Sequence, residues 1–256
     1  GFLLVDRPGE DSILLDCFFA VPAGGAQPMD EVVIDFGDAS TQVFHVGEGS
    51  VAVPGLVHGL ADAHARLGRL RWESLFTPAL ELAQRGFAVT PAQAFLHGIL
   101  EAILLRDAGG RRIYGTPGMV VTGDLVPTLR LLRDAGAEGM SELLPSLGDE
   151  LAGYRVVERQ PLTTAFAAAT VLTTPAPSVG GAVVARGLEA LAGEPATATG
   201  IGSDAAVALA RALSVGYAGP SPGAKPTGTT HVSVIDGSGA VAALSSTLGS
   251  GAGVFR

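Results

Sequence analysis

Two alternating segments near the end of the chain constrain its fold more than any other feature. Residues 230–235 and 240–248 each have the length and alternation of a β-strand, and residues 236–239 between them read Asp-Gly-Ser-Gly. Short strands joined by a glycine-containing turn are typical of an antiparallel hairpin. We therefore expect this part of the chain to form two paired strands.

The register of this hairpin places hydroxyl groups opposite one another. With the turn centred near Gly237 and Ser238, Thr229 lies opposite Ser246 or Thr247. A bulge would shift this pairing by a residue or two. Threonine pairs across strands commonly serve packing alone, so the spacing by itself assigns no catalytic role.

The other predicted elements follow in the order strands, helices, strands. Helical spacing of apolar residues, cap signals at Thr90 and closing glycines at Gly86 and Gly136 define the helical block. Glycine and proline make residues 216–228 the candidate linker. The predicted strands cover 1–5, 13–20, 32–36 and 155–159, and the predicted helices cover 56–70, 72–85, 124–135, 149–154, 180–192 and 203–215, with a further helix from residue 90.

This order favours an α+β fold over a repeated βαβ pattern. In such a fold the first and last strands can share one sheet. Hydrophobic residues form 47% of the chain and charged residues 16%, which is typical of a packed domain.

Charge and hydropathy argue against two classes of partner. The net charge is −9, and 16 basic residues are scattered among 25 acidic ones. Because nucleic acid is bound by neutralising phosphates with Lys and Arg, we expect no nucleic-acid partner. A membrane-spanning helix needs about 18 or more apolar residues in a row, and the sequence has no such run.

The sequence also gives no sign of a metal or cofactor. The single cysteine, Cys17, lies in an apolar run and is interpreted as a core thiol. The histidines have no zinc-binding spacing, and the glycine-rich stretch at 249–253 lacks the Lys-Ser/Thr of a phosphate-binding loop. We therefore expect neither a metal nor a cofactor.

Several motifs, in the same order along the chain, resemble one known family. The run at 228–236, Gly-Thr-Thr-His-Val-Ser-Val-Ile-Asp, resembles the start of the small subunit of γ-glutamyltransferases, which are N-terminal-nucleophile hydrolases. The segments that resemble other parts of the same family are 1–5, 50–60, 72–89, 151–159 and 175–181.

The resemblance implies a four-layer αββα sandwich, incomplete at both ends of this chain. It implies that Thr229 is the nucleophile and that the chain cuts itself between Gly228 and Thr229. Residues 1–228 then belong to the large subunit and residues 229–256 begin the small catalytic subunit. The expected assembly is a heterodimer of these two cleaved subunits, and the expected substrate is a γ-glutamyl or related amide such as glutathione.

The chemistry explains the residue types at the cleavage point. A threonine hydroxyl needs a nearby base, and the α-amine freed by cleavage has a pKa near neutrality. Gly228 leaves the attacked carbonyl unobstructed. By resemblance, Thr247 hydrogen-bonds the nucleophile. His231 lies on the same face as Thr229, but we interpret it as a structural neighbour because the amine already provides the base.

Two positions depart from the family pattern in its substrate-binding part. Phe18 stands where the family has an arginine that binds the substrate carboxylate, and Gly249 stands where it has an asparagine. Loss of such a charged contact costs about 2–5 kcal/mol of binding. We therefore expect that Phe18 and Gly249 change the specificity of the enzyme for its amide substrate.

Two alternatives remain open on the sequence alone. One is an acylase of β-lactam type, and the other is a homologue that never matures. The chain lacks an initiator Met and ends shortly after the hairpin, so we expect an internal piece of a longer enzyme, inactive by itself. The compartment stays undetermined.

Overall fold

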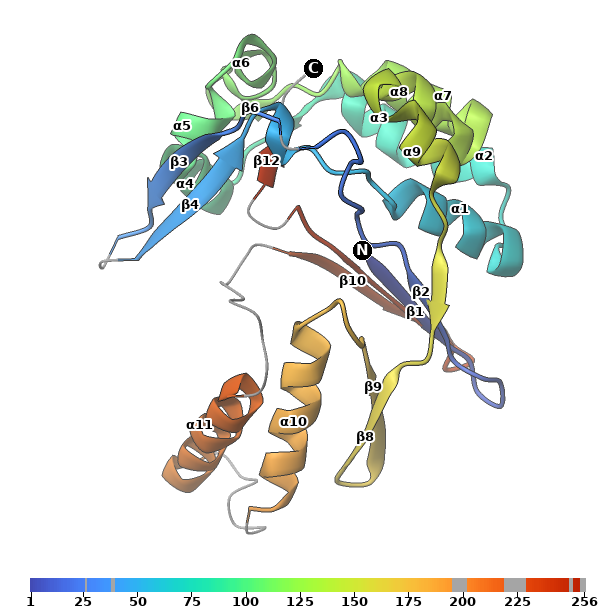
Figure 1. Ribbon diagram of the computed structural model, residues 1–256, viewed down its shortest axis with the longest axis vertical. Helices are drawn as coiled ribbons and strands as arrows, with labels where there is room; N and C mark the ends of the chain where they lie inside the picture. Colours follow the sequence, from blue (N-terminus) through green and yellow to red (C-terminus); the bar gives the residue numbers. More distant parts are fainter. Residues whose placement is uncertain (26, 38–39, 195–201, 219–228, 249–250, 254–256) are drawn as a thin grey trace. The chain divides into compact units, whose positions relative to one another are not determined.

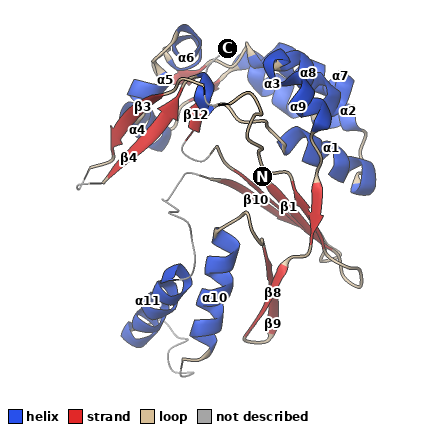
Figure 2. Cartoon of the chain, in the orientation of Figure 1, coloured by secondary structure: helices blue, strands red, loops and turns tan. Residues whose placement is uncertain are grey.

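The computed structural model describes residues 1–25, 27–37, 40–194, 202–218, 229–248 and 251–253 (Figure 1). The chain divides into two compact units. The first contains Gly1, Cys17–Val156 and Ser246–Arg256, and the second contains Phe2–Asp16 and Val157–Ser245. Helices and strands occur in both, so the predicted α+β class is confirmed (Figure 2).

A five-stranded sheet forms the centre of the second unit. Its strand order is β10-β11-β1-β2-β7, so the last hairpin of the chain lies beside the first one. The shared sheet expected from the sequence is therefore confirmed. Its strands are β1 (Phe2–Asp6), β2 (Ile13–Asp16), β7 (Val157–Arg159), β10 (Thr230–Ile235) and β11 (Val241–Ser246).

The interior strands of this sheet are held by apolar burial and one ion pair. Leu14 and Leu15 of β2 are almost completely buried. Asp16, also buried, accepts a hydrogen bond from Nε of Arg159 on the neighbouring strand β7 at 2.5 Å. A buried carboxylate needs such a partner because desolvation of an unpaired charge is costly.

The second unit also contains a hairpin and two helices. The helices α10 and α11 pack on each other, and Arg186 of α10 donates two hydrogen bonds to the carbonyl of Gly216 in α11. α11 reaches Ala218, so residues 216–218 of the predicted linker are helical, and the rest of that prediction, 219–228, lies outside the described residues. The elements are β8 (Leu162–Phe166), β9 (Ala169–Thr173), α10 (Gly180–Ala192) and α11 (Ser203–Ala218).

The first unit joins short strands to a block of helices. β12 runs parallel to β4, which pairs with β3, and β5 pairs with β6. The strands are β3 (Asp30–Asp35), β4 (Thr41–Val46), β5 (Phe87–Ala88), β6 (Met119–Val120) and β12 (Gly251–Gly253). The helices are α1 (Leu56–Leu67), α2 (Trp72–Leu75), α3 (Thr77–Arg85), α4 (Pro91–Ile99), α5 (Glu101–Leu104), α6 (Ala108–Tyr114), α7 (Leu125–Ala135), α8 (Gly139–Leu143) and α9 (Gly148–Gly153), with 3-10 turns at Glu48–Ser50, Gly136–Glu138 and Pro145–Leu147.

The helix boundaries follow local chemistry. Gly86 and Gly136 close α3 and α7 with φ of 66° and 61°, a conformation that glycine adopts without strain. Thr90 and Gln93 form the capping box of α4. The helix expected over 72–85 is broken at Phe76, because Pro78 has no N–H with which to continue the hydrogen bonds of α2.

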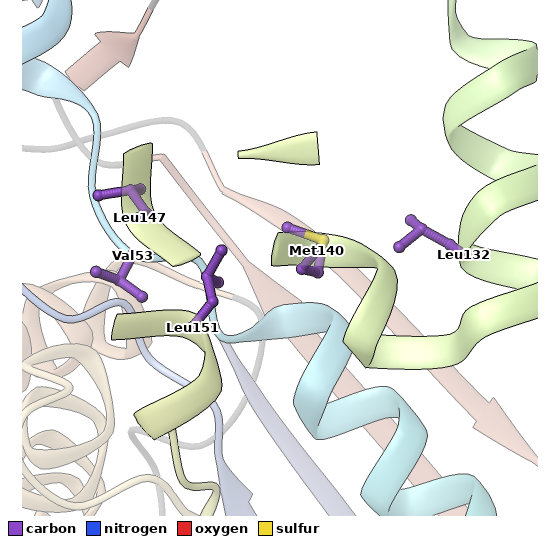
Figure 3. Close-up of a cluster of buried hydrophobic side chains, with 5 residues drawn as sticks. All are labelled: Val53, Leu132, Met140, Leu147 and Leu151. Carbon is purple, nitrogen blue, oxygen red and sulfur yellow. The ribbon is translucent and has the colours of Figure 1, made fainter. Parts of the chain in front are cut away.

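One buried cluster of the first unit lies among α7, α8, α9 and the segment before α1. Figure 3 shows its buried side chains, which come from parts of the chain far apart in sequence. This packing fixes the segment from which α1 starts. The cluster consists of Val53, Leu132, Met140, Leu147 and Leu151.

Candidate active site

The turn of the β10–β11 hairpin is built around one aspartate. The carboxylate of Asp236 accepts hydrogen bonds from the backbone N–H groups of Ser238 and Ala240 at 2.8 and 3.1 Å. The backbone N–H of Asp236 donates to the carbonyl of Ala240 at 3.0 Å, which closes the turn. Asp commonly nucleates turns in this way because its short side chain reaches the backbone two residues ahead.

A side-chain contact farther along the hairpin agrees with this register. His231 on β10 contacts Ser245 on β11. Asp236, just after β10, is as far from His231 in sequence as Ala240, just before β11, is from Ser245. The register expected from the sequence is confirmed at these two pairs. The pairing of Thr229 with Thr247, one step farther on the same face, stays a prediction.

The candidate catalytic threonines flank the two strands. Thr229 immediately precedes β10 and is exposed, and Thr247 immediately follows β11 and is half-buried. Thr229 belongs to the second compact unit and Thr247 to the first. Gly228 and Gly249, the other two candidates of this region, lie outside the described residues.

Phe18 lies in a segment that leaves the sheet. A strand was expected over 13–20, but β2 ends at Asp16, and Ala20 instead makes an isolated bridge with Val53. The half-buried ring of Phe18 stacks on that of Phe19 with centroids 4.4 Å apart, and 42% of Phe19 is exposed. Phe18, which stands where the family resemblance leads one to expect an arginine, therefore lies against a second aromatic ring.

The backbone of this segment is fixed by Tyr154 and by α1. The hydroxyl of Tyr154 donates to the carbonyl of Phe18 at 2.6 Å. A Cβ at Gly55 would lie 2.7 Å from the carbonyl oxygen of Cys17, and one at Gly59 would lie 2.6 Å from its Sγ. These two glycines let α1 pack closely against Cys17, and the burial of the Cys17 thiol expected from the sequence is confirmed.

His58, on the same turn of α1, is a half-buried histidine beside Tyr154. Its ring centroid lies 5.1 Å from that of Tyr154. Burial lowers the pKa of the His58 imidazole below its usual value of 6.5; a hydrogen bond with the backbone of Leu151 opposes this shift, and the charge of Arg155 adds to it. His58 is therefore neutral near pH 7.

One contact that the sequence did not reveal involves Ser50. Its Oγ accepts a hydrogen bond from the N–H of Gly253 at 3.0 Å and donates to the carbonyl of Gly47 at 2.8 Å. A Cβ at Gly251 would lie 3.1 Å from the Ser50 carbonyl. The glycine-rich run was a signal of such a close approach, but nothing in the sequence names its partner.

The residue ranges that the structure describes contain neither a metal-binding cluster nor a membrane-spanning helix. Within these ranges, no group of three or more His, Cys, Asp or Glu side chains is arranged to hold a metal ion. Among the helices that the structure describes, none has the length and apolar character needed to cross a bilayer.

Comparison with known proteins defines the class. The fold resembles the crystal structure of Helicobacter pylori γ-glutamyltranspeptidase with a TM-score of 0.68 at 22% identity, over 85% of this chain and 68% of that one. The chain thus has the α+β fold seen in γ-glutamyltranspeptidases. Residues 20–140 match the family model described as Gamma-glutamyltranspeptidase.

Sequence relatives agree with this match. Acylase ACY 1 proenzyme of Pseudomonas sp. (strain V22) is 32% identical over 197 residues, which cover 68% of this chain and 35% of that protein. Glutathione hydrolase proenzyme of Pseudomonas aeruginosa is 29% identical over 207 residues, which cover 73% of this chain and 36% of that protein. The chain belongs to the γ-glutamyltranspeptidase family.

The matches cover only part of the relatives' length, and the match to the family model does not reach the candidate site residues. The chain spans about a third of the length of the curated relatives it matches, at 35% and 36%. The residues that match the family model contain none of the candidates Phe18, Thr229 and Thr247. The roles of these three residues remain predictions.

Proposed function

We propose that this chain is part of a self-cleaving amidohydrolase or acyltransferase of the γ-glutamyltransferase type, with Thr229 as its nucleophile. The observation that carries the proposal is the position of Thr229 at the first residue before an edge strand, in a chain of this family. The finer fold we propose is the four-layer αββα sandwich of N-terminal-nucleophile hydrolases.

The proposed maturation starts with an acyl shift. Oγ of Thr229 attacks the carbonyl carbon of Gly228, the C–N bond breaks, and the hydroxyl proton passes to the departing nitrogen. Water then hydrolyses the resulting ester, which leaves a carboxylate on Gly228 and a free α-amine on Thr229. That amine is a base of suitable pKa for the hydroxyl beside it.

The same two groups then act on substrate. The Thr229 hydroxyl gives its proton to the amine and attacks the amide carbonyl, and the leaving amine departs with a proton. Water or a second amine releases the acyl group from threonine. In this proposal Thr247 hydrogen-bonds the nucleophile, as the hairpin register and the family resemblance predict.

Two strand pairings support the idea that the cleaved products remain together as a heterodimer. β11, after the cleavage point, pairs along the whole of β1 from Phe2↔Ser245 to Asp6↔Val241. β12, also after it, pairs with β4. Breaking one peptide bond removes neither set of hydrogen bonds, so the products have no reason to separate.

Intact-mass spectrometry of the full-length gene product tests the proposal. We expect two fragments divided between Gly228 and Thr229, which co-elute in gel filtration. Thr229→Ala should remain uncut, Thr229→Ser should still be cut, and Thr230→Ala is the matched control. A single uncut chain in the wild type would contradict the mechanism and favour a homologue that never matures.

A second candidate function differs only in the acyl group of the substrate. The Phe18–Phe19 stack favours an apolar acyl chain over a γ-glutamyl group with its charged carboxylate. The relative called an acylase is consistent with this choice. Hydrolysis rates of a γ-glutamyl anilide and an acyl anilide of similar size, measured side by side, distinguish the two.

A further inference from the structure

His231 lies between two serine hydroxyls on the β10–β11 hairpin. Its Nδ1 is 2.7 Å from Oγ of Ser245 on β11, and its Nε2 is 2.8 Å from Oγ of Ser233 on β10 itself. The first contact crosses from one strand to the other. The second fixes the ring orientation along the same strand.

Both ring nitrogens are thus in use. A neutral imidazole has one N–H and one lone pair, so it donates to one serine hydroxyl and accepts from the other. When protonated it donates to both, and the two contacts persist. In either state no lone pair of His231 is free to take a proton from the Thr229 hydroxyl.

The strand that carries His231 pairs with β11 at one end of the five-stranded sheet. In the part of the chain that the structure describes, all six residues of β10 are exposed. Exposed edge strands are prone to slip in register, and a slip of one residue turns every side chain to the opposite face. Thr229 precedes this strand directly and, by the period of two, shares the face of His231.

We propose that His231 is a positioning residue for the self-cleavage at Thr229, a clasp that holds β10 in register with β11 through Ser245. This inference rests on the proposed function. Reaction within one molecule depends strongly on alignment, and misplacement by about 1 Å can cost about 100-fold in rate. A misplacement smaller than about 1 Å costs correspondingly less, so we expect about a tenfold slower cleavage when the clasp is removed.

The test follows cleavage of the full-length chain over time after cell-free synthesis, by mass spectrometry, from pH 5.5 to 8.5. The variants are His231→Ala, Ser245→Ala and His231→Asn, whose amide reaches the position of Nδ1. Val232→Ala is the control, since it changes the neighbouring exposed residue on the opposite face. Thermal midpoints are measured for all.

We expect about a tenfold slower cleavage in His231→Ala and in Ser245→Ala. Their melting temperatures should match that of the control, His231→Asn should restore the rate, and the pH profile should keep its shape. Wild-type rates in His231→Ala, or in Ser245→Ala, would overturn the clasp. A slow His231→Asn variant with an altered pH profile would also overturn it, because His231 would then be the base.

The two levels of failure are distinguishable. Cleavage that depends on Thr229 but not on His231 removes this inference and leaves the proposed function intact. Absence of cleavage in the wild type, or its persistence in Thr229→Ala, removes both.

Discussion

Adding one methyl group to α1 should destabilise the protein where the same change in α4 does not. Gly59 and Gly98 both lie inside helices. A Cβ at Gly59 would overlap Cβ and Sγ of Cys17, whereas a Cβ at Gly98 would meet nothing within 4 Å. The pair therefore separates packing from helix propensity.

The magnitudes follow from two opposing effects. Alanine is favoured over glycine in a helix by about 1 kcal/mol. Overpacking a core costs about 1–3 kcal/mol, and the upper end applies here because Cβ of Cys17 cannot rotate away. Gly59→Ala should thus lose about 2 kcal/mol, while Gly98→Ala should gain up to about 1 kcal/mol.

Urea denaturation of both variants measures this difference. A loss of about 2 kcal/mol corresponds to a melting temperature lower by roughly 4–8 °C in a protein of this size. Cys17→Gly removes both overlapping atoms. Gly59→Ala should therefore lose less stability in a Cys17→Gly protein than it loses in the wild type. Equal midpoints for Gly59→Ala and Gly98→Ala would refute the close packing of α1 on Cys17.

Two more predictions concern specificity and pH. Phe18→Arg should raise the preference for γ-glutamyl over apolar-acyl anilides about tenfold or more; an equal effect of the control Phe19→Arg would remove Phe18 from substrate binding. The pKa of His58 in the folded protein is lowered below 6.5, so the unfolded chain binds the proton first as pH falls, and stability decreases below about pH 6.5. The melting temperature should fall more between pH 7.5 and 5.5 in the wild type than in His58→Gln, and equal falls would contradict the prediction.

Features that depend on neighbouring residues were predicted well. The turn at Asp236, the helix ends at Gly86 and Gly136 and the cap at Thr90 all lie where the sequence indicated. Each rests on a local rule: a positive φ that glycine tolerates, or a side chain that reaches its own backbone. The single helix predicted over 72–85 was too long, because the apolar spacing favours one helix whereas Pro78 interrupts its hydrogen bonds.

Two further errors arose where the chain changes partners. Apolar residues continue past Asp16, but β2 does not. The hydrogen bonds between Cys17 and Gly1 extend the β1–β2 register by one pair, whereas Ala20 makes its backbone hydrogen bonds with Val53. The paired strands β8 and β9 were missed altogether, since the turn between them reads Ala167-Ala168 and has no Gly, Pro, Asn or Asp to mark it. The positive φ of 53° at Ala167 is visible only in the structure. Composition alone does not show which partner a strand segment will find.

The sequence by itself therefore determined the α+β class, the boundaries of several helices and strands, the hairpin register at Asp236 and the family motifs around Thr229. Tertiary structure alone decided which distant groups meet: Ser50 with Gly253, Tyr154 with Phe18, and Gly59 with Cys17. The physical reason is the range of the interactions. Turns and caps are set by a few adjacent dihedral angles, whereas these contacts exist only once separate elements have packed together.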